Sequence, residues 1–293
     1  MGINYNVIKA DIVDILPNFE NNKIAFIAKN IKKKDEEQIT YIFKPSWVGH
    51  YHNVNEYIAH HIGSLIGAPI LDGVFLEISP DNMQKWDKII KSFHPSAILP
   101  TFIPPYNRAI FFAVEFKQDK FHAASVAELS NELKKTSNKE EYYAQFSLDQ
   151  YLKNPDRHLG NHIFYQEPHK LMFYLIDFDR LFRGHTDWST LDVDIKNFSC
   201  FKDKNYNMDL YPTVCNTFIR QVHDYAAKIE KISDEDLEDI LKTTSIIYGI
   251  DKINLGKLSQ WLYTRRDEIY NACLINEPCY PKVSKRGYLS ASI

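Results

Sequence analysis

One short segment, with three polar residues and two apolar runs, constrains the fold of this chain more than any other. NPDRHLGN places Asp156 and Asn161 five positions apart, and Asp177 follows sixteen positions later at the end of LMFYLID. The runs 162–165 and 171–178 are short and mostly apolar, which predicts two strands. A carboxylate at the end of a buried strand must be paired or metal-bound to offset the loss of water. The segment therefore predicts a polar site beside two strands.

These residue types fit phosphoryl transfer, which needs positioning and charge neutralisation more than covalent chemistry. The interval from Asp156 to Asn161 is that of the kinase catalytic loop D-x-x-x-x-N. A loop of this length can return the Asn161 amide to a metal while Asp156 faces the acceptor hydroxyl. An ordinary polar turn after Pro155, with Asp177 capping a loop, would explain each residue separately. It does not explain all three in this order.

A second candidate pair lies nearer the N-terminus. KIAFIAKN (23–30) and ITYIFKP (39–45) predict a β-hairpin, and Lys44 lies at its end. Glu56 follows twelve positions later, inside a helix predicted over 54–66. A lone lysine at a strand end is usually a surface residue. The paired Glu56 and the downstream loop favour instead the lysine that holds ATP phosphates in kinases.

The apolar periodicity changes along the chain. Further strands are predicted over 7–16, 73–78 and 109–116. Further helices are predicted from Ser233 onward and over 255–274. Residues 80–108 contain five prolines and are expected to be irregular, and helical patterns dominate after about residue 125. We therefore expect a two-lobed α+β fold, with a β-rich lobe over 1–117, an α-rich lobe over 118–293 and a ligand cleft between them.

Composition argues against several classes of protein. The formal net charge is −3, so no overall basic field would gather nucleic acid. The basic run KNIKKK (29–34) is followed by acidic residues, which indicates a solvated turn. Four cysteines form no CxxC pair, and the histidines at 50, 52, 60 and 61 have no standard metal spacing. Without a signal peptide or a membrane-length apolar run, we expect a cytoplasmic protein that binds neither membrane nor nucleic acid directly.

NPDRHLGNHIFY followed by YLIDFDRLF resembles the D-R-H-x-x-N and I-D signatures of HipA-like kinases, and phosphoinositide kinases share this loop. Three other stretches resemble the HipA-like family: IFKP with NEYIAHHIGSLIGAPILDGVFLEI, the lead-in AQFSLDQYLKNPDRH, and WLYTRRDEIYNACL near the C-terminus. The resemblance covers roughly residues 5–275. It implies a protein-kinase-like fold and an ATP- and Mg²⁺-dependent kinase acting on a protein Ser/Thr hydroxyl. It also implies a toxin-type role with an antitoxin or DNA-binding partner.

The resemblance further implies a role for each candidate residue. Lys44 would hold the ATP phosphates and pair with Glu56. Asp156 would be the catalytic base, and Asn161 and Asp177 would hold Mg²⁺. The residues expected near the adenine, through backbone groups, are Glu115, Phe116 and Lys117.

One segment departs from the family pattern at the place of the phosphate-cradling loop. ILPNFENN (15–22) has no Gly that would let backbone N–H groups approach a phosphate closely. It also has no Ser of the kind that some HipA-type toxins autophosphorylate. Asn18, Asn21 and Asn22 can adopt positive φ and replace glycine in part. The chain is also shorter than full HipA toxins and resembles a compact version without their N-terminal subdomain.

Other positions near the site leave alternatives open. After Asp177 the chain reads Phe-Asp-Arg with no Gly. Asp179 is then either a second metal carboxylate or the partner of a nearby arginine, Arg180 or Arg183. Arg157 contacts either a carboxylate or a phosphate. His158 is expected to brace the catalytic loop by hydrogen bonds.

Two other functions remain open from the sequence. The acceptor can be a lipid or a small molecule, because other phosphotransferases share the Asp-to-Asn loop. The absence of a basic membrane-binding stretch argues against a lipid. The chain can also be a pseudokinase that only binds nucleotide, which the Gly-free 15–22 segment favours. The four retained residues Lys44, Asp156, Asn161 and Asp177 oppose that reading.

Overall fold

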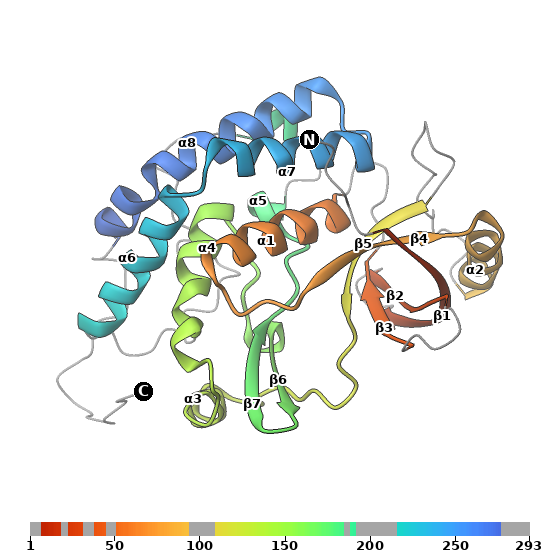
Figure 1. Ribbon diagram of the computed structural model, residues 1–293, viewed down its shortest axis with the longest axis horizontal. Coiled ribbons are helices and arrows are strands. Elements are labelled where there is room, and N and C mark those ends of the chain that lie inside the picture. The colour runs from red at the N-terminus through yellow and green to blue at the C-terminus, as the bar shows by residue number, and fades with distance from the viewer. Residues whose placement is uncertain are drawn as a thin grey trace.

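A computed structural model describes residues 7–18, 23–31, 38–44, 51–93, 109–184, 188–191 and 216–276. The strands are β1 (Val7–Asn18), β2 (Lys23–Asn30), β3 (Thr40–Phe43), β4 (Gly73–Ile78), β5 (Ala109–Glu115), β6 (His162–Glu167) and β7 (Lys170–Leu175). The α-helices are α1 (His52–Ile66), α2 (Pro80–Phe93), α3 (Val126–Leu133), α4 (Ala144–Leu152), α5 (Leu181–Gly184), α6 (Asn216–Glu230), α7 (Asp234–Tyr248) and α8 (Lys252–Asn276). Short 3-10 turns lie at Lys139–Tyr143, Leu159–Asn161 and Trp188–Thr190. Strands dominate before α1, and helices dominate toward the C-terminus (Figure 1).

The first five strands close into a barrel in the order β1-β2-β3-β5-β4. The predicted hairpin is confirmed, because β2 pairs with β3 in antiparallel register. The barrel closes where β1 pairs with β4 in parallel. Inside it, the rings of Phe26, Phe43 and Phe111 stack in series, with centroids 5.3 and 4.8 Å apart. These alternate inward side chains give the barrel a core of its own.

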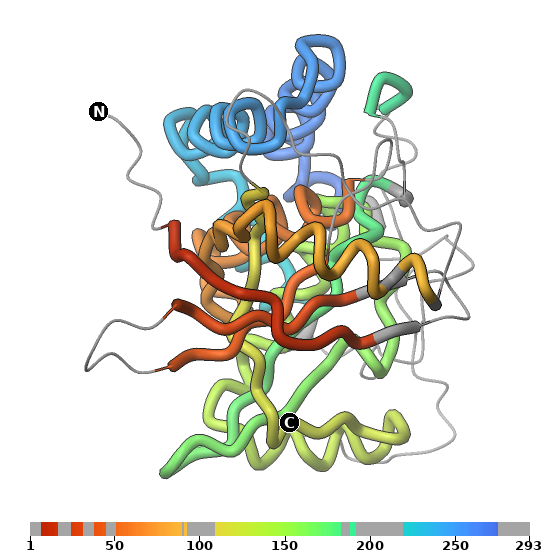
Figure 2. The backbone as a smooth tube through the Cα atoms, turned by 90° about the vertical axis from the view of Figure 1, so that its right-hand side faces the viewer, coloured from red at the N-terminus to blue at the C-terminus, as the bar shows by residue number. Residues whose placement is uncertain are grey.

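Helix α2 corrects the expectation that residues 80–108 are irregular. Pro80 begins the helix, where its missing N–H costs nothing. The register of β1 against β2 shifts between Ile12 and Asp14. At this irregularity, side chains of α2 form hydrogen bonds with the backbone of Ile12. Trp86 donates its ring N–H to the Ile12 carbonyl at 2.8 Å, and the Ile12 N–H donates to Asn82 at 2.9 Å. Figure 2 shows α2 lying along β1 on this side of the molecule.

Residues 94–108, the remainder of that proline-rich stretch, lie outside the described ranges.

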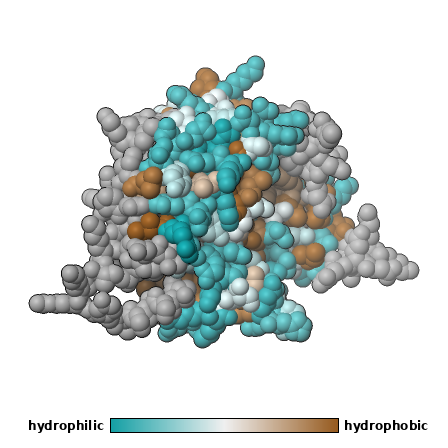
Figure 3. Space-filling model, turned by 60° about the vertical axis from the view of Figure 1, so that its left-hand side comes forward, coloured by the Kyte–Doolittle hydropathy of each residue, from teal (hydrophilic) through white to brown (hydrophobic). Residues whose placement is uncertain are grey.

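The larger core lies among the helices. Buried side chains of α1, α4, α6, α7 and α8 form one cluster with β6, β7 and the outer side of β5. Helix α1 lies between the barrel and the other helices (Figure 1). It ends where predicted, at Gly67 in left-handed conformation, and α7 begins with the predicted Ser233 cap. Hydrophilic residues predominate on the face in Figure 3, as expected where apolar helix faces turn inward.

The expected mixture of helices and strands is therefore confirmed. Within the described ranges, no helix has both the length and the apolar character required to traverse a bilayer. The barrel and the helical part meet along α1 and β5, and the residues predicted to carry chemistry gather beside this junction.

Candidate active site

The β6–β7 hairpin brings two of the predicted residues together. Its antiparallel register pairs His162 with Leu175 at the end of the ladder. Asn161 therefore precedes the hairpin where Asp177 follows it, and the Ile176 N–H donates to the Asn161 carbonyl at 3.0 Å. The interval of sixteen positions from Asn161 to Asp177 is thus set by the length of one hairpin.

Asn161 is fixed so that one side of its amide is left without a partner. Its Nδ2 donates to the carbonyl of Asp156 at 2.9 Å and of Asp177 at 3.4 Å. Its Oδ1 is buried and accepts no hydrogen bond among the described residues. A buried amide oxygen without a donor is costly, and a hard cation such as Mg²⁺ would satisfy it. Asn161 therefore fits the role of a magnesium ligand.

Asp177 leaves the strand in an unusual conformation. Its φ of 62° lies in the left-handed region, which Asp tolerates better than most residues. The predicted strand 171–178 accordingly ends at Leu175, because a residue with positive φ cannot continue the ladder. The next N–H, that of Phe178, donates to Glu56 Oε1 at 3.0 Å. This turn attaches the end of β7 to α1.

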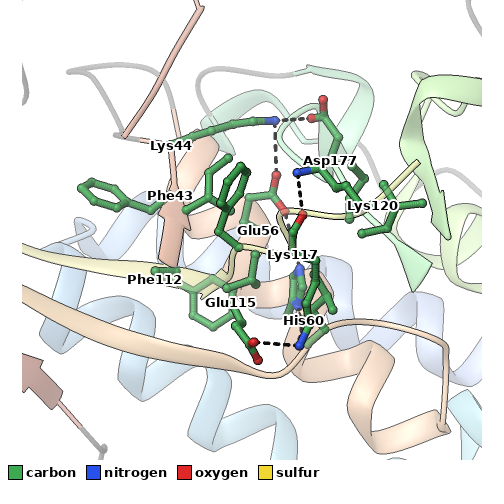
Figure 4. Close-up of a pocket in the computed structure, with 16 residues that line it drawn as sticks. Phe43, Lys44, Glu56, His60, Phe112, Glu115, Lys117, Lys120 and Asp177 are labelled. Atoms are coloured by element: carbon green, nitrogen blue, oxygen red, sulfur yellow. Dashed lines mark hydrogen bonds and ion pairs between the residues drawn. The ribbon is translucent and has the colours of Figure 1, made fainter. Parts of the chain in front are cut away.

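Lys44 is the centre of a charged cluster (Figure 4). Figure 4 shows its Nζ facing Glu56 Oε1, at 3.5 Å, and Asp177 Oδ1, which it contacts directly. Asp179 Oδ2 lies 3.3 Å from the same Nζ. The expected pairing of Lys44 with Glu56 is therefore present. Asn53, at the start of α1, holds the Lys44 carbonyl at 2.8 Å and so fixes the strand end that carries the lysine.

The charges in this cluster shift each other's protonation. Burial opposes the charge on Lys44, but Asp177, Asp179 and Glu56 outweigh it and raise the pKa of Lys44 above its ordinary value. Burial also raises the pKa of Glu56 to about 7, against the lowering effect of Lys44. Lys44 thus stays charged, while Glu56 exchanges a proton near neutral pH.

Glu56→Gln is expected to flatten the pH dependence of the free energy of unfolding. The Glu56 carboxyl group loses its proton near pH 4.5 in the unfolded chain and near pH 7 in the folded chain. Between these two pH values the folded state therefore binds more protons than the unfolded state. Wild-type stability should therefore fall as the pH rises through it, and the variant should lack this fall. Urea unfolding at about pH 5 and about pH 7 measures the difference.

Glu238→Gln, on the exposed side of α7, is the control for that measurement and should shift stability equally at both pH values. If wild type and Glu56→Gln lose stability in parallel, Glu56 does not carry the proton.

The sequence left open whether Arg157 contacts a carboxylate or a phosphate, and the structure pairs it with a carboxylate. Its Nε and Nη2 donate to the two oxygens of Asp149 at 2.9 Å, and both side chains are fully buried. Its Nη1 donates to the Ile176 carbonyl at 3.0 Å, and the guanidinium lies 4.6 Å from the centre of the Phe178 ring. Sequence reasoning missed Asp149, although an acid within the apolar run QFSLDQYL was the available signal.

Two further side chains shape the catalytic loop. Asp156 pairs with Arg180, whose Nε lies 3.4 Å from Asp156 Oδ2, so Arg180 does not serve Asp179. Asp179 faces Lys44 instead, and the side chain of Arg183 lies outside the description. The Gly160 N–H donates to the His158 ring at 3.1 Å, which agrees with a bracing role for this histidine.

A cavity beside the cluster is lined by β3, β5 and β6. The Lys44, Glu56 and Asp177 side chains line it together with apolar residues: Ile42, Phe43, Leu71, Phe112, Val114, Ile163 and Ile176. The predicted adenine-side residues Glu115, Phe116 and Lys117 line it as well. The Phe116 N–H, however, donates to the Thr40 carbonyl at 2.8 Å and is not available to a ligand. An apolar cavity with charges grouped in it suits a nucleotide.

Among the described residues, the histidines are not grouped to hold a metal ion. His60 Nδ1 lies 2.9 Å from the Leu71 carbonyl, and burial lowers the pKa of His60 to about 4, so its ring is neutral. Across the described ranges, no three His, Cys, Asp or Glu side chains group to hold a metal. Mg²⁺ needs no such group, since one or two protein ligands with phosphate oxygens and water commonly hold it.

Neither the protein-family models nor the curated proteins give a match to this chain. Solved structures do. The crystal structure of CtkA, a proinflammatory kinase of Helicobacter pylori, matches with a TM-score of 0.50 at 15% identity, over 92% of this chain and 99% of that one. The chain therefore shares the fold of that kinase over most of its length. The kinase family resemblance that the sequence predicted is thereby confirmed at the level of fold.

A second structure is HipA of Shewanella oneidensis, solved with HipB and operator DNA. It matches with a TM-score of 0.43 at 9% identity, over 89% of this chain and 62% of that chain. The present chain thus spans less than two thirds of that HipA chain.

Proposed function

We propose that this chain is an ATP- and Mg²⁺-dependent phosphotransferase that acts on a Ser/Thr hydroxyl of a protein. One observation carries the proposal: Lys44, Glu56 and Asp177 line one largely apolar cavity, and the Asn161 side chain is held beside Asp177 by the backbone carbonyls of Asp156 and Asp177. These are the groups that phosphoryl transfer requires, and they come from distant parts of the chain.

Each group has a role in this proposal. Lys44, oriented by Glu56, pairs with the nucleotide phosphates. Asn161 Oδ1 and Asp177 hold Mg²⁺, which when bound neutralises phosphate charge. Asp156 orients the acceptor hydroxyl and accepts its proton. Arg180 pairs with the Asp156 carboxylate and so helps to fix its position.

The charge of the site supports a divalent cation. Among the described ion pairs that involve Lys44 or Asp156, two cations face four carboxylates: Lys44 and Arg180, and Glu56, Asp156, Asp177 and Asp179. With all six ionised, two negative charges are in excess within this group. Such an excess attracts Mg²⁺ and would repel a bare phosphate chain, so metal and nucleotide are expected to bind together.

The proposal includes the finer points of the family resemblance. The barrel side and the helical side act as the two lobes, 1–117 and 118–293, on either side of the cavity. An antitoxin or DNA-binding partner, a toxin-type role and a cytoplasmic location stay predictions of the sequence.

The deciding experiment incubates the purified protein with γ-labelled ATP and Mg²⁺, alone and with cell lysate. Label on protein is expected with wild type and not with Asp177→Ala. The variant should also lose at least about 10-fold in Mg²⁺-dependent ATP affinity, because a metal ligand is gone. Asp72→Ala, which removes an exposed carboxylate, serves as the matched control.

The other results separate the competing functions. ATP binding that requires Mg²⁺ without label on any protein would favour a lipid or small-molecule acceptor, and labelling of such extracts tests that directly. Binding with no transfer to any extract would favour the pseudokinase. Equal Mg²⁺-dependent binding by wild type and Asp177→Ala would contradict the metal assignment.

A further inference from the structure

Three lysines line the cavity, and their charges are balanced in different ways. Lys44 faces three carboxylates, and Lys117 pairs with Glu115 at 2.8 Å. Lys120 has no carboxylate partner among the described residues. Its Nζ donates to the Lys117 carbonyl at 3.3 Å and lies 4.0 Å from the centre of the Phe116 ring (Figure 4).

This arrangement leaves the Lys120 ammonium only partly compensated. It is half-buried at the cavity, and burial lowers its pKa. One carbonyl and one aromatic ring recover part of the lost hydration. An anion that enters the cavity would recover more. Of the described lysines that line the cavity, Lys120 is the one without a described carboxylate partner.

The sequence supplies an independent reason to expect such a cation. Kinases and other nucleotide-binding proteins commonly hold phosphate with backbone N–H groups of glycine-rich loops. The corresponding segment here, 15–22, contains no glycine. The pairing of β1 with β2 also continues to Asn18 and Lys23, which leaves only residues 19–22 for the connection. A sequence without glycine offers fewer backbone N–H groups that a phosphate can approach closely.

We propose that Lys120 is a nucleotide-binding residue whose ammonium group pairs with a phosphate group of the nucleotide. This contact would replace part of the phosphate binding that a glycine-rich loop provides in other kinases. This inference rests on the proposed function, because it assumes that the cavity holds a nucleotide. Lysine suits the role, since its ammonium is a point charge on a flexible stem and needs no fixed planar geometry.

The test compares Lys120→Gln with wild type for binding of ATP, ADP, AMP and adenosine by calorimetry, with Mg²⁺ present. One lost charge-assisted hydrogen bond should weaken ATP binding about 10- to 100-fold. Adenosine affinity should change less than about twofold, because it has no phosphate. Lys120→Arg, which keeps the charge, should restore most of the ATP affinity.

Lys88→Gln, an exposed lysine on α2, controls for the change in net charge, and thermal unfolding of Lys120→Gln controls for its fold. Equal ATP affinity in wild type and Lys120→Gln would overturn the inference while leaving the proposed function standing. Weakening of adenosine and ATP by the same factor would also overturn it, because Lys120 would then act through packing. A wild-type chain that binds no ATP would contradict the proposed function itself.

Discussion

Asp156→Asn is expected to slow phosphoryl transfer to the acceptor at least about 100-fold, while ATP affinity stays close to that of wild type. The replacement keeps the shape of the side chain but removes the group that accepts the hydroxyl proton. Asp156 is not among the residues that line the cavity proposed to hold the nucleotide, and its backbone carbonyl, which holds Asn161, is retained. The effect should therefore fall on the rate of transfer and spare nucleotide binding.

Single-turnover transfer from γ-labelled ATP measures this rate directly, and calorimetry measures the affinity in parallel. Asp81→Asn, an exposed carboxylate in the first turn of α2, is the matched control and should transfer at the wild-type rate. If Asp156→Asn transfers phosphate near the wild-type rate, Asp156 is not the base. If it loses ATP affinity as strongly as it loses rate, Asp156 acts on the nucleotide instead.

The site residues were predictable because their intervals match elements of fixed length. Asn161 and Asp177 lie sixteen residues apart because a six-residue strand, a turn and another six-residue strand return the chain to its starting point. Lys44 meets Glu56 because β3 ends beside the first turn of α1. A sequence records such distances whenever the connections are short and the apolar runs are clear.

Other features depend on contacts that no local pattern records. Closure of the barrel requires β1 to pair with β4, whose partners Val7 and Phe75 are far apart in the chain. Helix α2 was missed because Pro80 and the prolines after it suggested irregular structure, whereas Trp86 is held by a backbone group freed at a bulge in β1. The sequence also does not record that Arg180 pairs with Asp156 rather than with Asp179, because this pairing depends on how the segments lie in space.

The burial of Arg157 was hidden for the same reason, and it leads to the largest stability effect that we expect. Arg157→Met should lower the free energy of unfolding by about 3–5 kcal/mol, because it leaves the Asp149 carboxylate buried without its partner. Both side chains have no solvent exposure, and Asn154 donates a further hydrogen bond to Asp149 at 2.9 Å. Urea unfolding monitored by circular dichroism measures the loss.

Lys170→Met is the matched control for that loss. Lys170 pairs with Glu167 at 3.5 Å on an exposed hairpin, and breaking such a surface pair should cost less than about 1 kcal/mol. The double variant Arg157→Met with Asp149→Leu should recover part of the loss, since it removes the stranded charge as well. Similar losses for Arg157→Met and Lys170→Met would contradict the structural role. Because Arg157 also holds the carbonyl of Ile176, next to Asp177, the double variant should regain stability without regaining the wild-type rate of transfer.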